Sequence, residues 1–130
     1  MIRQHFYVEH YWEVIIYYNV DYDLLCDIVK DLKAAGFSRV FVLDVFYNMY
    51  IEEAKAVTCS NTKNTTSIVL FNIHKDSQDY INSIVHEAEH IKQAMLYAYC
   101  VKDAGEPPAY TIGYLVGKMW GVFRELICTA

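Results

Sequence analysis

The chain has 130 residues, of which 55% are hydrophobic and 21% charged, and its net charge is −5 at pH 7. This length and composition predict a single domain, residues 1–130, with a packed core and no disordered segment. The acidic balance, with Lys and Arg scattered along the chain, argues against nucleic-acid binding, because phosphate-binding surfaces are usually basic.

The first half of the chain predicts a strand, a helix and a segment of mixed character. No long apolar run follows Met1, so the N-terminus does not have the pattern of a secretory signal. Residues 11–18 (YWEVIIYY) are aromatic and β-branched, which is typical of a strand. Asp21 can cap a helix whose apolar residues keep helical spacing from 24 to 32, and Gly36 stands where that helix should stop. Residues 38–51 have the composition of a strand but the apolar spacing of a helix, and we favour a helix.

The second half predicts a hairpin followed by two long helices. Residues 54–60 and 66–73 are strand-like and flank the polar turn-forming sequence 61–64 (NTKN). Ser77 can cap a helix that starts at residue 78, passes through residues 86–90 and ends before Gly105. Pro107 and Pro108 suit the first turn of a last helix, which we expect to run to about residue 127.

The last helix also raises the questions of membrane insertion and of helix packing. Its apolar stretch, residues 109–123, is shorter than the ~20 residues that span a bilayer and contains Lys118, so we expect a buried helix and no membrane. Gly113, Gly117 and Gly121 recur every fourth residue, and we expect them to allow close packing against the preceding helix.

The predicted fold class is α+β, with a small antiparallel sheet packed on helices. The four cysteines are far apart and contain no Cys-x-x-Cys pair, so we expect reduced, buried thiols in a cytoplasmic protein. We also place Trp12 and Trp120 in the core. The cysteines are Cys26, Cys59, Cys100 and Cys128.

Residues 86–90 read His-Glu-Ala-Glu-His, a pattern that predicts a metal site. On a helix, His86 and His90 are one turn apart and point within roughly 40° of each other, so both imidazoles can reach one ion. Glu87 would stand beside that ion, where its carboxylate can take a proton from a metal-bound water. Glu89 is more simply explained as a solvated charge or as a hydrogen-bond partner of a histidine.

The rest of this helix predicts a metal face that is separate from the core face. Ser83, Gln93 and Tyr97 share the side of the two histidines. The other histidines, His5, His10 and His74, have no ligand spacing. The apolar residues gather on the opposite side: Ile81, Ile84, Val85, Ala88, Ile91 and Met95.

A zinc hydrolase normally has three protein ligands, so a further carboxylate is needed. The residues themselves leave Asp103, Glu106 and Glu125 open, since all three follow His90. Glu106 can reach the histidines only if their helix ends or kinks near Ala98, because an unbroken helix to residue 102 would end about 18 Å beyond His90.

The sequence Glu106-Pro107-Pro108-Ala109-Tyr110 contains a second motif, which makes a resemblance to a known family specific. Together with residues 86–90 it resembles gluzincin-type peptidases, in which a ligand glutamate begins a downstream helix as Glu-x-x-Ala. Residues 72–117 are similar to short phage-type proteins with the same two motifs. The resemblance implies a minimal zincin fold and one Zn²⁺ per chain, held by His86, His90 and Glu106.

Tyr110 departs from the family pattern, which often has Asp or Asn at this position. Its phenol could orient a ligand histidine by accepting an N–H, or it could face the substrate and stabilise an oxyanion, and both roles stay open.

Two functions follow from this reading. The first is a zinc-dependent peptidase acting on a peptide or protein, with Glu87 as general base and Tyr110 as a second catalytic candidate. Residues 66–73 would form a strand at the cleft edge that holds the substrate by β-addition. The second is a non-catalytic zinc-binding or protein-interaction module of phage or mobile-element origin. The sequence names neither a substrate nor an oligomeric state.

Overall fold

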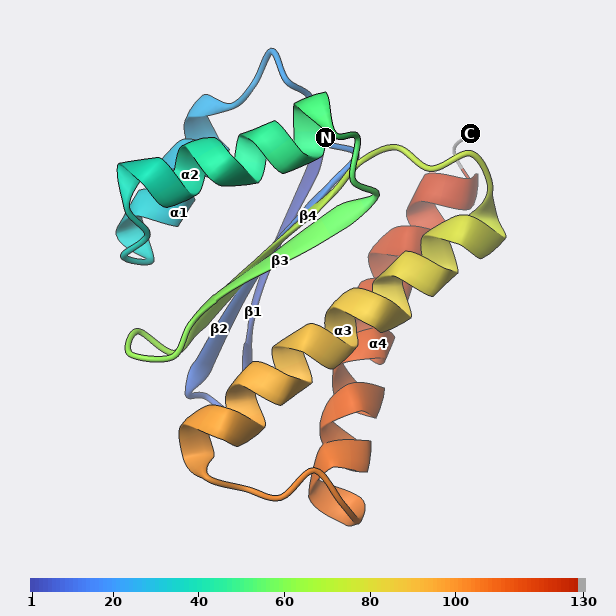
Figure 1. Cartoon of the computed structure of the whole chain (residues 1–130). Helices are drawn as coiled ribbons and strands as arrows, with labels where there is room; N and C mark the ends of the chain where they lie inside the picture. Colours follow the sequence, from blue (N-terminus) through green and yellow to red (C-terminus); the bar gives the residue numbers. More distant parts are fainter. Residues whose placement is uncertain (129–130) are drawn as a thin grey trace. The chain divides into compact units, whose positions relative to one another are not determined.

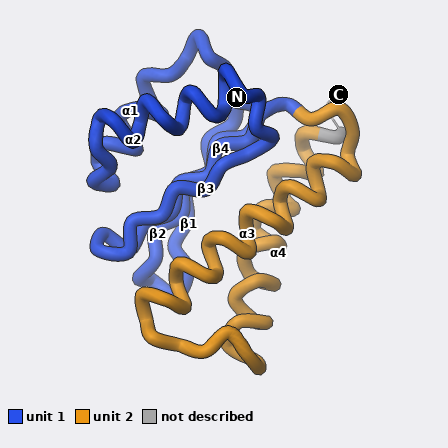
Figure 2. The backbone as a smooth tube through the Cα atoms, in the orientation of Figure 1, with its two compact units in different colours: residues 1–73 blue, residues 74–130 orange. Residues whose placement is uncertain are grey.

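The computed structural model describes residues 1–128 of the chain, and the side chains up to Leu126. The chain divides into two compact units, Met1–Ile73 and His74–Ala130 (Figure 2). The α+β class is confirmed at the level of a four-stranded mixed sheet with helices (Figure 1). The elements are β1 (Ile2–Val8), β2 (Trp12–Tyr18), α1 (Cys26–Ala34), α2 (Arg39–Phe46), the π-helical turn η1 (Tyr47–Ile51), β3 (Ala56–Asn61), β4 (Thr66–Phe71), α3 (Ser77–Tyr99) and α4 (Glu106–Cys128).

The sheet of the first unit has the order β1-β2-β4-β3. β1 with β2 and β3 with β4 are antiparallel hairpins, as expected for the second pair, but β2 and β4 run parallel with Ile15 opposite Ile68. The predicted antiparallel sheet is therefore wrong at its centre, because α1, α2 and β3 form a crossover between these two strands. The prediction that the strand within residues 66–73 holds a substrate by β-addition is also wrong, because β4 already pairs with β2 and β3.

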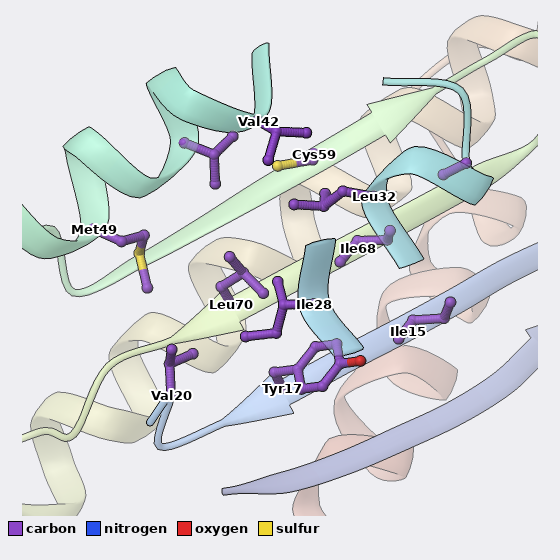
Figure 3. Close-up of a cluster of buried hydrophobic side chains, with 12 residues drawn as sticks. Ile15, Tyr17, Val20, Ile28, Leu32, Val42, Met49, Cys59, Ile68 and Leu70 are labelled. Atoms are coloured by element: carbon purple, nitrogen blue, oxygen red, sulfur yellow. The ribbon is translucent and has the colours of Figure 1, made fainter. Parts of the chain in front are cut away.

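One face of the sheet is covered by α1, α2 and η1, and the core of the first unit lies between them (Figure 3). Ile15 and Leu70 face Ile28 of α1, while Val42 and Met49 contribute from α2 and η1. The helix favoured for residues 38–51 is confirmed, and Ser38 caps it by accepting a hydrogen bond from the Phe41 N–H. This segment is amphipathic, with one buried face, which explains why its apolar spacing was helical.

The second unit consists of α3 and α4, which pack against each other in antiparallel orientation (Figure 1). α4 begins at Glu106, so Pro107 and Pro108 occupy its first turn as predicted. α3 is capped by Asp76, whose carboxylate accepts from the Asp79 N–H, and not by Ser77. In the described part of the chain, no helix has both the length and the apolar character that crossing a membrane requires.

Two predictions about the packing of α4 are wrong in this structure. Among the residues that the structure describes, a Cβ built on Gly113, Gly117 or Gly121 would meet nothing within 4 Å, so the glycine stripe makes no close helix packing with them. Trp120 is 48% exposed, whereas Trp12 is fully buried as expected.

The cysteines differ in burial, although all four were expected to be buried. Cys59 is buried, whereas Cys26 and Cys100 are exposed, and none of these three forms a disulfide. The side chain of Cys128 lies outside the described residues.

Candidate metal centre

α3 presents His86 and His90 on one side of a continuous helix. The helix runs for 23 residues and ends at Tyr99, where Cys100 takes the left-handed conformation with φ 56°. It thus ends one residue after Ala98, near which it must end if Glu106 is to reach the histidines. Both histidines are exposed, as a reactive site requires.

The two imidazoles converge on one point. Their Nε2 atoms lie 3.1 Å apart, and the ring planes meet at 78° with centroids 4.7 Å apart. Two nitrogen ligands bound at ~2.0–2.1 Å to one tetrahedral ion are about 3.3 Å apart. The same contact also serves as a hydrogen bond, with one ring N–H donating to the other ring nitrogen.

Glu87 belongs to the same group but comes from the buried side of α3. One ligand atom each from His86, Glu87 and His90 lie within 4.8 Å of one another. The Glu87 side chain is only 4% exposed and shares its side of the helix with Ile84 and Ala88. The carboxylate is therefore held by the packing of the helix, at the border between its two faces.

The predicted core face of α3 is only partly right. Ile81 and Val85 are exposed, while Ser83 is buried although we placed it on the histidine side. The buried face is rotated relative to the prediction, and this rotation brings Glu87 into it. The buried residues of α3 are Tyr80, Ser83, Ile84, Glu87, Ala88, Ile91, Lys92, Met95 and Leu96.

The neighbouring carboxylates Glu89 and Asp103 bind Lys92. Each lies 2.9 Å from the Lys92 ammonium, and the hydrogen bonds that Lys92 donates to Glu89 and, second, to Asp103 raise the pKa of Lys92. Glu89 also accepts a hydrogen bond from Gln93 at 3.2 Å. Asp103 thus holds the α3–α4 link against α3 two residues beyond His90.

The two residues predicted from α4, Glu106 and Tyr110, are both exposed. Glu106 is the first residue of α4 and is exposed, and the group of ligand atoms around His86 does not include it. Tyr110, one turn later, is 64% exposed. At 100° per residue both stand opposite the buried side of α4, which contains Leu115 and Met119. The assignment of Glu106 as third ligand stays a prediction.

His74 and Ser83 form a polar contact that the sequence did not predict. The His74 Nε2 and Ser83 Oγ atoms are 2.7 Å apart, and the His74 ring stacks on Tyr80 at 4.3 Å. Ser83 lies one turn before Glu87 on the buried face of α3, so both polar side chains belong to that face. His74 and Ser83 are nine residues apart, and His74 precedes the helix. Helical periodicity therefore does not predict their contact.

Comparisons with known proteins do not add to this picture. No family model, no curated protein and no solved structure matches the chain. The function must therefore be argued from the residues of the site.

Proposed function

We propose that the chain binds one zinc ion through His86 and His90 and acts as a zinc-dependent peptidase. The observation that carries the metal site is the 3.1 Å separation of the two Nε2 atoms, which suits two ligands on one ion. The resemblance of residues 86–90 and 106–109 to gluzincin-type peptidases supports zinc as the metal, a peptide bond as the target and a zincin-like fold.

In this proposal the chain's own residues have separate roles. When bound, zinc polarises a carbonyl oxygen and acidifies the water that attacks it. His86, His90 and Glu106 hold the ion. The Glu87 carboxylate takes a proton from the attacking water and delivers it to the nitrogen of the leaving amine. The Tyr110 phenol donates a hydrogen bond to the substrate oxygen or accepts one from a ligand histidine.

A second function has its own supporting observation. The groups gathered around His86 are His90 and Glu87, so Glu87 itself can complete a three-ligand site. A carboxylate that binds the metal is no longer available as general base. The chain would then be a non-catalytic metal-binding or protein-interaction module.

Glu87→Gln separates the two functions, because the amide keeps the shape of the side chain but cannot accept a proton. We expect the variant to retain about one zinc per chain and to lose hydrolysis of an unbiased peptide library by ~10²–10⁴-fold. His86→Ala should lose zinc, whereas Gln93→Ala, on the same side of α3, should keep both zinc and activity.

The measurements are elemental analysis after zinc dialysis and mass spectrometry of the peptide products. A wild type that holds no zinc while folded contradicts the metal site. Loss of zinc in Glu87→Gln, together with an inactive wild type, supports the non-catalytic module instead.

A further inference from the structure

An apolar groove in the first unit is separate from the metal centre. It lies between the segment that precedes α1 and the outer side of α2 and η1, and its volume is about 460 Å³. Tyr22 and Leu25 form one wall. The other wall is a stripe at helical spacing, Leu43, Phe46, Tyr47, Tyr50 and Ile51.

This stripe is large and solvent-accessible. Leu43, Tyr47, Tyr50 and Ile51 are 60%, 51%, 61% and 58% exposed. Single exposed apolar residues are ordinary, but a contiguous patch of this kind marks an interaction site. Spacing of three or four residues along a helix is the pattern that a second amphipathic helix matches.

The groove is held in shape by a network centred on Asn72. The Asn72 side-chain amide donates to the carbonyl oxygen of Met49 at 2.9 Å and to that of Ala54 at 2.7 Å, which ties η1 to the loop that follows it. The Asn72 side-chain oxygen Oδ1 accepts a hydrogen bond from the Tyr22 hydroxyl. The ring centroids of Tyr22 and Tyr50 are 4.8 Å apart. A groove whose walls are already ordered loses less entropy when a partner binds.

The rim of the groove is acidic. The two segments that line it, residues 22–25 and 43–51, contain no Lys or Arg, and the charged residue among the lining side chains is Asp23. This charge favours a basic partner, and it disfavours both a second copy of this acidic chain and an anionic membrane surface. Besides Asp23, the acidic residues within these segments or next to them in the sequence are Asp21, Asp44, Glu52 and Glu53.

We propose that the groove binds a basic amphipathic helix of a partner protein. Apolar residues of that helix, spaced three or four apart, pack on Leu43, Tyr47 and Tyr50, and its Lys and Arg side chains face the acidic rim. This binding does not involve the metal ligands, all of which lie in the second unit.

The probe is a synthetic amphipathic Leu/Lys helix, with a Leu/Glu helix of the same pattern as its counterpart. Fluorescence anisotropy of the labelled peptides measures Kd for the full-length chain. We expect the Leu/Lys peptide alone to bind, and Tyr47→Ala or Leu43→Ala to raise its Kd by about tenfold or more. Asp23→Asn combined with Glu52→Gln should raise Kd and reduce its dependence on salt.

Val40→Ala is the matched control, because Val40 is 77% exposed on α2 but does not line the groove. This variant should bind as the wild type does, and so should His86→Ala. Amide chemical shifts should change in residues 22–25 and 43–51. The proposal is overturned if Val40→Ala weakens binding as much as Tyr47→Ala, if the Leu/Glu peptide binds equally well, or if the free protein forms a dimer that Tyr47→Ala dissolves.

Discussion

At the residue scale, the two candidate functions differ in what they require of Glu106. If Glu87 is the general base, a third ligand must come from elsewhere, and Glu106 is the carboxylate that the resemblance supplies. The α3 helix extends about 14 Å beyond His90, and the six residues from Cys100 to Gly105 can span ~20 Å. The Lys92–Asp103 ion pair already draws this link back toward His90, which supports an approach of Glu106 to the metal.

We therefore expect Glu106→Ala to weaken zinc binding by more than about 100-fold, since it would remove a direct ligand. Competition with a chelating dye measures this affinity. Asp103→Ala is the matched control, because it removes a carboxylate from the same link. It should change the affinity by no more than about fivefold, because a partly exposed ion pair is worth ~0–1 kcal/mol.

A Glu106→Ala variant with wild-type zinc affinity would contradict this ligand set. It would leave His86, Glu87 and His90, the groups that the structure gathers, as the ligands. A larger effect from Asp103→Ala would show that the wrong carboxylate was chosen.

At the element scale, the end of α1 depends on side chains from the β3–β4 turn. Asn61 and Asn64 both donate to the Ala35 carbonyl oxygen, at 2.9 and 2.7 Å. Gly36 follows with φ +93°, and a Cβ there would lie 2.5 Å from the Asn64 amide nitrogen and 2.9 Å from that of Asn61. The predicted role of Gly36 as helix stop is confirmed, and the polar hairpin turn has a second role as the cap of α1.

Gly36→Ala should lower the free energy of unfolding by ~1–3 kcal/mol, because it combines a strained backbone conformation with this overlap. Gly113→Ala should instead raise it by ~0.5–1 kcal/mol, since Gly113 is helical and faces open space. Urea denaturation followed by circular dichroism measures both changes. Destabilisation by Gly113→Ala would mean that the glycine stripe is covered in solution.

At the scale of the whole molecule, zinc binding should stabilise one unit in particular. His86, Glu87, His90 and Glu106 all lie in the second unit. Free zinc at 100 times Kd should add ~2.7 kcal/mol to the stability of a state that holds the metal. Hydrogen exchange should therefore slow in α3 and α4 when zinc is added, while the amides of β2 and β4 change little.

A chelator should reverse this protection, and His90→Ala should abolish it. Equal slowing throughout the sheet would contradict the expectation of a local effect and would show that the two units unfold together.

Much of the local structure could be predicted from the sequence, because it depends on neighbours along the chain. The hairpin of β3 and β4, the start of α3 and the proline-led start of α4 follow from turn residues and apolar spacing. β1 was missed although Ile2, Gln4 and Phe6 alternate with more exposed residues. Its turn places Glu9 and His10 at positive φ without the Gly or Asn that usually indicates such a turn.

For the candidate site too, some features follow from the sequence and others only from the tertiary structure. The i,i+4 spacing of His86 and His90 is a property of any helix, so the sequence by itself determined that the two imidazoles can meet. The burial of Glu87, the pairing of Asp103 with Lys92 and the open space beside Gly113 required the tertiary structure. So did the parallel pairing of β2 with β4. Each of these depends on which distant segment lies beside a residue, and helical or strand periodicity carries no information about that neighbour.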